Sequence, residues 1–142
     1  MWLKQQEVEI EERIDPGLPA VFADRVQIEQ VLLNLLRNAI EAMEAANIER
    51  RSIVVAARRR GNRTVEISVA DSGPGVAAEV TDTLFEPFIT TKPFGTGMGL
   101  SISHTIVESN GGGLRMARGV RSGAVFIFDL PTADAAASTY AG

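Results

Sequence analysis

The sequence predicts an α+β sandwich in which a mixed, mostly antiparallel sheet is covered on one face by helices. Two observations support this fold class. Residues 24–43 repeat apolar side chains at helical spacing, and residues 52–71 and 114–131 each have the pattern of two strands around a turn. With a strand at 8–14 and a helix at 100–110, the order is strand, helix, hairpin, loop, helix, hairpin.

The first strand is predicted at residues 8–14, where Val8, Ile10 and Ile14 alternate with acidic side chains. Two prolines and a glycine in residues 15–19 would end a strand, because they favour turns over sheet pairing.

The long helix is predicted to begin at Asp24, because aspartate accepts hydrogen bonds from the free N–H groups at a helix start. The hairpin after it pairs residues 52–60 with 63–71 around a Gly-Asn turn, and its second strand ends at Asp71. The apolar positions that define the helix are Ile28, Val31, Leu32, Leu35, Leu36, Ala39, Ile40 and Met43.

Residues 85–99 are too rich in glycine, threonine and proline for regular structure, and a loop of this length is usually functional. Three consecutive glycines stop the second helix, predicted at 100–110. The last hairpin closes the domain, which we expect to span residues 1–131, with a disordered tail at 132–142.

The composition is that of one globular domain: 142 residues, 45% hydrophobic and 23% charged, with no cysteine. A net charge of −4 and a pI near 5.0 do not favour nucleic acid as a partner, and the basic run at residues 58–60 fits a solvated strand end. The sequence contains no stretch apolar enough to span a bilayer and no secretory signal, so we expect a cytoplasmic domain. The charged start after Met1 resembles mid-domain sequence. We therefore expect a piece of a longer protein, which can itself be attached to a membrane.

Two glycine clusters indicate nucleotide chemistry. Residues 73–78, GPGVAA, follow a strand and fit the G-x-G-x-x-A form of a dinucleotide-binding turn. Pro74 disfavours that alternative, because proline removes a donor from a turn that must offer N–H groups to a pyrophosphate. Thr90 and Thr91 also stand where such a turn needs a ribose-binding acid.

The second cluster, GTGMGLS at residues 95–101, has glycines at alternate positions directly before a helix. Such a turn lets backbone N–H groups and a helix N-terminus face an anion without interference from Cβ atoms. The cluster predicts a phosphate-binding loop, and its plain alternative is a flexible connection. No G-x-x-x-x-G-K-[ST] motif occurs, which excludes a P-loop.

Four motifs follow one another along the chain: N-x-x-x-N at Asn34 and Asn38, D-x-G-x-G at 71–75, F-x-x-F at 85–88 and G-x-G-x-G-L at 95–100. They resemble the N, first glycine, F and second glycine boxes of sensor histidine kinases. The catalytic ATP-binding domain of these kinases shares a superfamily with DNA gyrase, Hsp90 and MutL. The stretch FEPFITTKPFGTGMGLSIS is most similar to the nitrogen-regulation and oxygen-sensing kinases. The resemblance covers most of the chain and implies a Bergerat-type sandwich with a mobile ATP lid.

The resemblance implies roles for the paired asparagines. Asn38 matches the family's magnesium ligand, and an amide oxygen is a suitable hard ligand for Mg²⁺. Asn34 stands where the hydrolysing relatives carry a water-activating glutamate. Since an amide cannot take a proton from water at neutral pH, we expect ATP to be held without ready hydrolysis. The plain alternative is that both asparagines only cap or tether neighbouring backbone.

Asp71 resembles the carboxylate that accepts a hydrogen bond from the adenine amino group, where guanine carries an oxygen. An ordinary turn-forming aspartate is the alternative. Gly73 and Gly75 would let the backbone approach the base. Lys92 resembles the lid lysine that reaches the phosphates and would be catalytic together with Asn34 and Asn38; an exposed loop lysine is its alternative. The other residues implied to bind ATP are Thr90, Thr91, Gly95, Thr96, Gly97, Met98, Gly99 and Leu100.

Three positions depart from the family pattern. Glu41 and Ala42 stand where many members have a lysine and an aromatic residue, and Ala124 stands where a threonine hydroxyl is common. One phosphate contact, one stacking contact and one adenine contact are therefore missing or supplied elsewhere, which predicts modest affinity.

The only histidine, His104, has no acidic neighbour in the sequence and does not resemble a phosphoacceptor. The resemblance implies that the γ-phosphoryl group of Mg–ATP passes to a histidine on a separate dimerisation domain of the same parent protein, with a response regulator downstream. We expect this chain to be monomeric and its parent to be a homodimer. Two alternatives stay open. One is an ATP hydrolase of the same superfamily, which Asn34 disfavours, and the other is an ATP-binding interaction module such as a serine-kinase anti-sigma factor.

Overall fold

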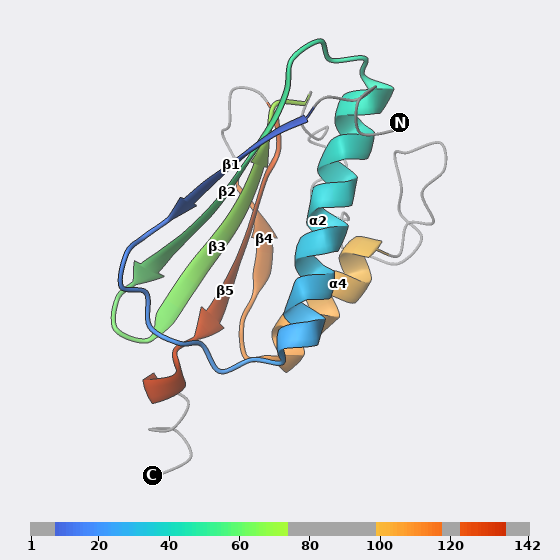
Figure 1. Ribbon diagram of the computed structural model, residues 1–142. Coiled ribbons are helices and arrows are strands. Elements are labelled where there is room, and N and C mark those ends of the chain that lie inside the picture. The colour runs from blue at the N-terminus through green and yellow to red at the C-terminus, as the bar shows by residue number, and fades with distance from the viewer. Residues whose placement is uncertain (1–7, 74–98, 118–122, 136–142) are drawn as a thin grey trace.

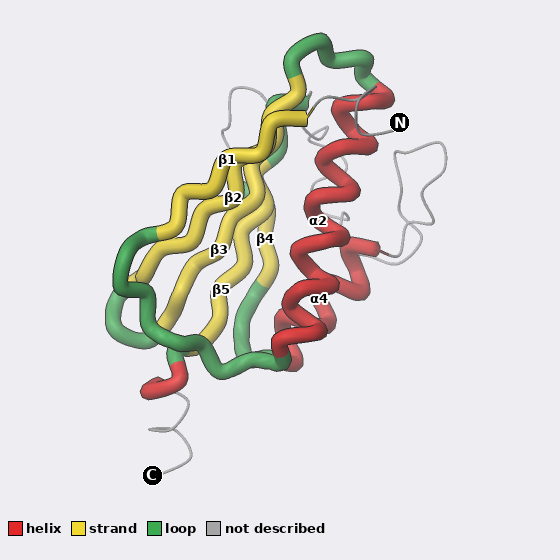
Figure 2. The backbone as a smooth tube through the Cα atoms, viewed as in Figure 1, coloured by secondary structure: helices red, strands yellow, loops and turns green. Residues whose placement is uncertain are grey.

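The computed structural model describes residues 8–73, 99–117 and 123–135. Over these residues, five strands form one sheet in the order β1-β2-β3-β5-β4, and two helices lie on one of its faces (Figure 1; Figure 2). The predicted fold class is therefore confirmed. Neither of these helices is both long and apolar enough to cross a membrane. The elements are β1 (Val8–Ile14), α2 (Arg25–Ala45), β2 (Arg51–Arg60), β3 (Thr64–Asp71), α4 (Gly99–Ser109), β4 (Leu114–Met116) and β5 (Val125–Pro131).

The sheet is mixed, because β1 runs parallel to β2 while the other three strand pairs are antiparallel. β2 and β3 form the predicted hairpin, and β5 pairs with β3 from Thr64↔Pro131 to Ala70↔Val125. This register brings the start of β5 next to the end of β3. β1 is an edge strand, and its Ile10 and Ile14 remain 54% and 51% exposed.

α2 begins where the sequence predicts, with Asp24 as its N-cap. The Asp24 side chain accepts a hydrogen bond from Gln27 N at 3.0 Å. The buried residues of α2 recur one turn apart, so that a single stripe of the helix faces the sheet. These residues and their main buried partners are Val31, Leu35, Ala39, Met43, Ile53, Val69, Val107, Leu114, Phe126, Phe128 and Leu130.

α4 ends on glycine as predicted: Gly111 has a φ of +87°, and its N donates to Glu108 O at 3.0 Å. The preceding residue, Asn110, ties this end of α4 to the start of α2. Asn110 Nδ2 donates to Gln27 Oε1 at 3.0 Å, and Asn110 Oδ1 accepts from Asp24 N at 2.8 Å. The two helices are therefore fixed relative to each other at this end.

The structure moves the predicted domain boundary toward the C-terminus. Thr132 is buried and forms a β-bridge with Val21, and its hydroxyl accepts from Ala135 N at 3.1 Å. Ala135 is also buried. The packed domain thus includes residues 132–135, because Thr132 and Ala135 are buried and Thr132 caps a short helical turn after β5. Residues 136–142 lie outside the described part of the chain.

A network of charges lies on the sheet face opposite the helices. Glu66 is only 5% exposed, and its carboxylate contacts Arg58 Nε at 2.7 Å and both Arg60 Nη1 and Arg115 Nη2 at 2.9 Å. Two residues of the basic run at 58–60 are therefore ion-paired and not only solvated. Burial raises the pKa of Glu66, but the hydrogen bonds and charges of Arg58 and Arg60 outweigh that effect and lower it.

Glu66→Gln should lower the free energy of unfolding by about 1–2 kcal/mol at neutral pH, since the arginines lose their anion but can still reach water. A pKa that is lowered on folding contributes stability above the unfolded pKa and loses it as pH falls through the folded pKa. The difference in unfolding free energy between the unmodified chain and Glu66→Gln should therefore shrink below about pH 4. Urea denaturation across this pH range measures it, with the exposed Glu49→Gln as control. A deficit independent of pH would contradict the charge-based explanation.

Candidate functional site

Asp71, the predicted adenine acceptor, is the last residue of β3. Its backbone N donates to Ala124 O at 3.0 Å, and its Oδ1 accepts from Gly73 N at 2.8 Å and from Ala124 N at 3.2 Å. Within the described residues, no donor contacts Oδ2 of Asp71. Backbone groups therefore hold the carboxylate in one orientation through Oδ1.

Two glycines make room for this arrangement. Gly123 has a φ of +76°, and a Cβ there would lie 1.9 Å from the carbonyl oxygen of Asp71. A Cβ on Gly73 would lie 3.0 Å from Asp71 Oδ1 and 3.3 Å from Met43 Cγ. The sequence interpretation missed Gly123, and it treated Ala124 only as a missing hydroxyl. Ala124 contacts Asp71 Oδ1 through its backbone N–H group, which every residue type except proline can supply.

Burial raises the pKa of the Asp71 carboxyl, and the N–H groups of Gly73 and Ala124 oppose that rise. No salt bridge involves Asp71 in the part of the chain that the structure describes. A partly buried carboxylate that lacks a cationic partner is costly to keep ionised. Such perturbed groups occur preferentially at functional sites, which supports a binding role for Asp71.

Asn34 and Asn38 lie one turn apart on α2, beside the stripe that forms the core. Both side chains are partly buried. Asn34 Nδ2 donates to Ser103 Oγ on α4 at 3.2 Å. This hydrogen bond joins Asn34 to a side chain of the neighbouring helix and not to backbone. The predicted placement of both amides on one helix face is confirmed.

The sequence interpretation also missed Ser103. It is fully buried and shares a helical stripe with Leu100 and Val107, which pack in or against the core. The available signal was a polar residue at a position where helical spacing requires an apolar one.

α4 begins at Gly99, the last glycine of the second cluster, and Leu100 packs against the core. The remaining predicted nucleotide contacts fall within residues 74–98, outside the described part of the chain, and stay predictions. The lid predicted there also stays a prediction. These contacts are Gly75, Thr90, Thr91, Lys92, Gly95, Thr96, Gly97 and Met98.

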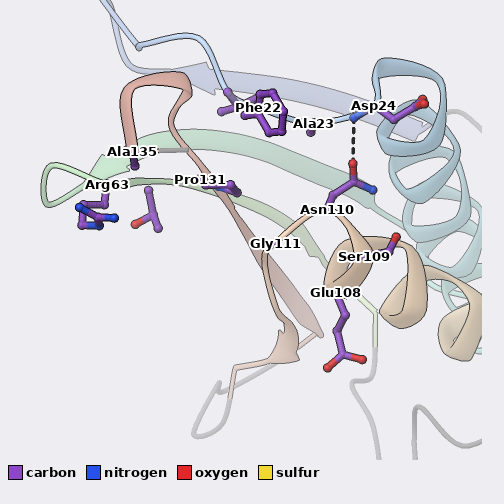
Figure 3. A pocket seen from close by; sticks show the side chains of 12 residues that line it. Phe22, Ala23, Asp24, Arg63, Glu108, Ser109, Asn110, Gly111, Pro131 and Ala135 are labelled. Atoms are coloured by element: carbon purple, nitrogen blue, oxygen red, sulfur yellow. Dashed lines mark hydrogen bonds between the residues drawn. The ribbon is translucent and has the colours of Figure 1, made fainter. Parts of the chain in front are cut away.

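A cavity of about 850 Å³ lies at the other end of the sheet, lined among others by Phe22, Arg63, Thr64 and Pro131 (Figure 3). Thr64 begins β3 and Asp71 ends it, which separates the two regions by about 23 Å at the usual rise of a strand. None of the predicted nucleotide-binding residues lines this cavity. The candidate site at Asp71 is therefore separate from this cavity.

Among the residues that the structure describes, no group of three or more histidine, cysteine, aspartate or glutamate side chains could hold a metal ion. The described side chains of the candidate site that carry oxygen atoms include the amides of Asn34 and Asn38. That donor set suits a hard ion such as Mg²⁺, which keeps several waters and takes few protein ligands.

The chain matches the family model of histidine kinase-, DNA gyrase B- and HSP90-like ATPases over residues 23–134. It is 45% identical over 131 residues to the sensor protein FixL of Bradyrhizobium diazoefficiens. The aligned region covers 92% of this chain and 26% of FixL. It is 40% identical over 116 residues to the sensory histidine kinase/phosphatase NtrB of Rhizobium leguminosarum bv. phaseoli, covering 74% of this chain and 30% of NtrB. The chain thus spans about a quarter to a third of the length of these curated relatives.

Solved structures give the same result. The nucleotide-free catalytic domain of histidine kinase ThkA matches with a TM-score of 0.77 and 35% identity, covering 92% of this chain and 84% of that chain. Full-length ShkA in complex with AMPPNP matches with a TM-score of 0.76 and 32% identity, covering 92% of this chain and 27% of the ShkA chain. ThkA in complex with the response regulator TrrA matches with a TM-score of 0.73 and 32% identity, covering 92% of this chain and 36% of the matched chain.

Proposed function

The chain belongs to the histidine kinase-, DNA gyrase B- and HSP90-like ATPase family, and we propose from this that it binds Mg–ATP as a phosphoryl donor. It is an ATP-binding catalytic domain of the sensor histidine kinase type, as the similarities to FixL, NtrB and ThkA indicate. In this proposal, the γ-phosphoryl group passes to a histidine on a dimerisation domain of the same parent protein.

The observation that carries the proposal is the carboxylate of Asp71. Its Oδ1 is occupied by the backbone N–H groups of Gly73 and Ala124, so Oδ2 can accept a hydrogen from the adenine amino group. Guanine presents an oxygen at that position, and two acceptors cannot bond to each other. The arrangement therefore selects ATP over GTP.

Asn38 fits the magnesium ion that the family implies, because it offers a partly buried amide oxygen one turn from Asn34. When bound, magnesium would neutralise part of the negative charge on the phosphates. Asn34 has no atom that takes a proton from water at neutral pH, so it does not activate water. Lys92 and the backbone N–H groups of residues 95–99 would supply the remaining positive charge.

The comparisons also support the classes of partner. ShkA was solved with AMPPNP and ThkA with the response regulator TrrA. We propose that this chain binds an adenine nucleotide and serves a dimerisation domain, and that the parent protein is a cytoplasmic or membrane-attached homodimer acting on a response regulator. The chain on its own would be monomeric.

Incubated with γ-labelled ATP, magnesium and the dimerisation domain of its parent, the chain should pass the label to that domain and release little inorganic phosphate. His104→Ala should leave this transfer intact. His104 lies on α4 with its Nδ1 3.3 Å from Glu108 Oε1 one turn away, in a contact typical of a helix surface. Label that stays on this chain and disappears with His104→Ala would contradict the assignment.

The same assay separates the alternative functions. Rapid release of phosphate by the unmodified chain would favour an ATP hydrolase and would contradict the role given to Asn34. Binding of ATP with transfer to a serine of a partner, and none to histidine, would favour an anti-sigma factor. The expected product is a phosphohistidine, which acid treatment destroys and alkali preserves.

A further inference from the structure

Ser103 is a buried polar residue that the proposed function does not use. It is 0% exposed and lies on α4, one turn after Gly99, where the predicted phosphate-binding loop ends. Its Oγ accepts from Asn34 Nδ2 on α2 at 3.2 Å, across 69 residues of sequence. The two helices lie side by side (Figure 1). Ser103 is therefore a direct link between the helix that follows the loop and the asparagine pair.

Packing alone does not explain a serine at this position. Leu100 and Val107 on the same stripe are apolar, and alanine would allow α2 and α4 to approach equally closely. A buried hydroxyl needs a hydrogen-bond partner, because leaving it without one costs free energy. Among the described residues, the partner of the Ser103 side chain is the amide of Asn34.

The hydrogen bond holds the Asn34 amide in place, with Nδ2 on the side of Ser103. A side-chain amide has an N–H₂ group that donates and an oxygen that accepts, and a free amide can exchange them by rotating about its last bond. With Nδ2 held by Ser103, the oxygen Oδ1 points away from that contact. Asn38 follows one turn later on the same face of α2.

We propose that Ser103 is a positioning residue that fixes the amide of Asn34, so that Oδ1 meets the nucleotide, its magnesium or their water. This inference rests on the proposed function for the identity of the ligand. The hydrogen bond joins two side chains of the protein and involves no ligand atom. A rigid amide lowers the cost of ordering the site at the moment of phosphoryl transfer.

The test is a double-mutant cycle of Ser103→Ala and Asn34→Ala, with the rate of phosphoryl transfer as readout. Ser103→Ala should slow transfer about three- to tenfold, since one hydrogen bond is lost, and change ATP affinity less than about twofold. In the Asn34→Ala background, Ser103→Ala should not slow transfer further, because the amide that Ser103 contacts is already absent. The same relative loss in both backgrounds would overturn the proposal.

Ser109→Ala is the matched control, because Ser109 is an exposed serine on the same helix whose hydroxyl donates to Ile106 O at 2.9 Å. It should change neither rate nor affinity in either background. Thermal denaturation of each variant shows that it folds. Ser103→Cys, whose thiol is somewhat larger and a weaker acceptor, should give an intermediate rate. A Ser103→Cys rate equal to that of the unmodified chain would count against a hydrogen-bonding role.

A second measurement does not depend on ATP. In the NMR spectrum of the nucleotide-free chain, the side-chain N–H₂ signals of Asn34 should shift on Ser103→Ala, and those of the distant Asn62 should not. Unshifted Asn34 signals in a chain that does transfer phosphate would overturn this inference alone. Shifted signals in a chain that transfers none would overturn the proposed function and leave the link between Ser103 and Asn34 standing.

Discussion

Asp71→Asn is expected to weaken ATP binding roughly 10- to 100-fold, because it removes a charge-assisted hydrogen bond to the adenine amino group. The asparagine oxygen can still accept from Gly73 N and Ala124 N, as Asp71 Oδ1 does at 2.8 and 3.2 Å. The N–H₂ group then takes the place of Oδ2 and faces another donor. Calorimetric titration with ATP measures the loss.

The same substitution should not destabilise the domain at neutral pH. Burial raises the pKa of Asp71, and a carboxyl whose pKa is raised on folding stabilises the fold only at low pH. That contribution is full below the unfolded pKa and is lost as pH rises through the folded pKa. The thermal midpoint of Asp71→Asn should therefore equal or exceed that of the unmodified chain at pH 7 and fall behind it in acid.

The exposed Asp134→Asn is the control and should change neither affinity nor thermal midpoint. A lost thermal transition in Asp71→Asn at pH 7 would show that Asp71 serves the turn and not the ligand. Unchanged ATP affinity in a folded variant would remove Asp71 from adenine recognition.

Asn38→Ala is expected to reduce phosphoryl transfer at least about 100-fold, because transfer depends on the positioned metal that the Asn38 oxygen would hold. Alanine is a better helix former than asparagine, so α2 should remain folded. ATP binding measured in EDTA should change little, whereas the gain in affinity on adding magnesium should be lost. Parallel titrations with and without magnesium separate these effects.

Gln30→Ala is a matched control, since Gln30 is an exposed amide on the same helix, two turns before Asn38. It should leave both transfer and the magnesium effect unchanged. Retention of the full magnesium effect in Asn38→Ala would show that the ion is held by other groups.

Local signals account for the parts of the fold that could be predicted. Asp24 marks the start of α2 because a cap is a contact within one turn, and Gly111 marks the end of α4 because few other residues tolerate its backbone angle. The hairpins follow from alternating side chains around short turns. Asp71 was predicted because it stands in a motif that specifies residue types.

The rest depends on contacts between residues far apart in the sequence, or on backbone atoms. The insertion of β5 between β3 and β4 and the link from Asn34 to Ser103 arise only when the chain folds back. Arg115 joins Glu66 across 49 residues for the same reason. The N–H group of Ala124 is invisible in the sequence, because it belongs to the backbone and not to a residue type.

Parallel calorimetric titrations of the unmodified chain with ATP and GTP, each with magnesium, test adenine recognition most directly. We predict that ATP binds at least about tenfold more tightly, because Oδ2 of Asp71 can accept from adenine and meets an acceptor on guanine. The preference should disappear in Asp71→Asn. Equal affinities for the two nucleotides in the unmodified chain would contradict the role of Asp71 and the site built around it.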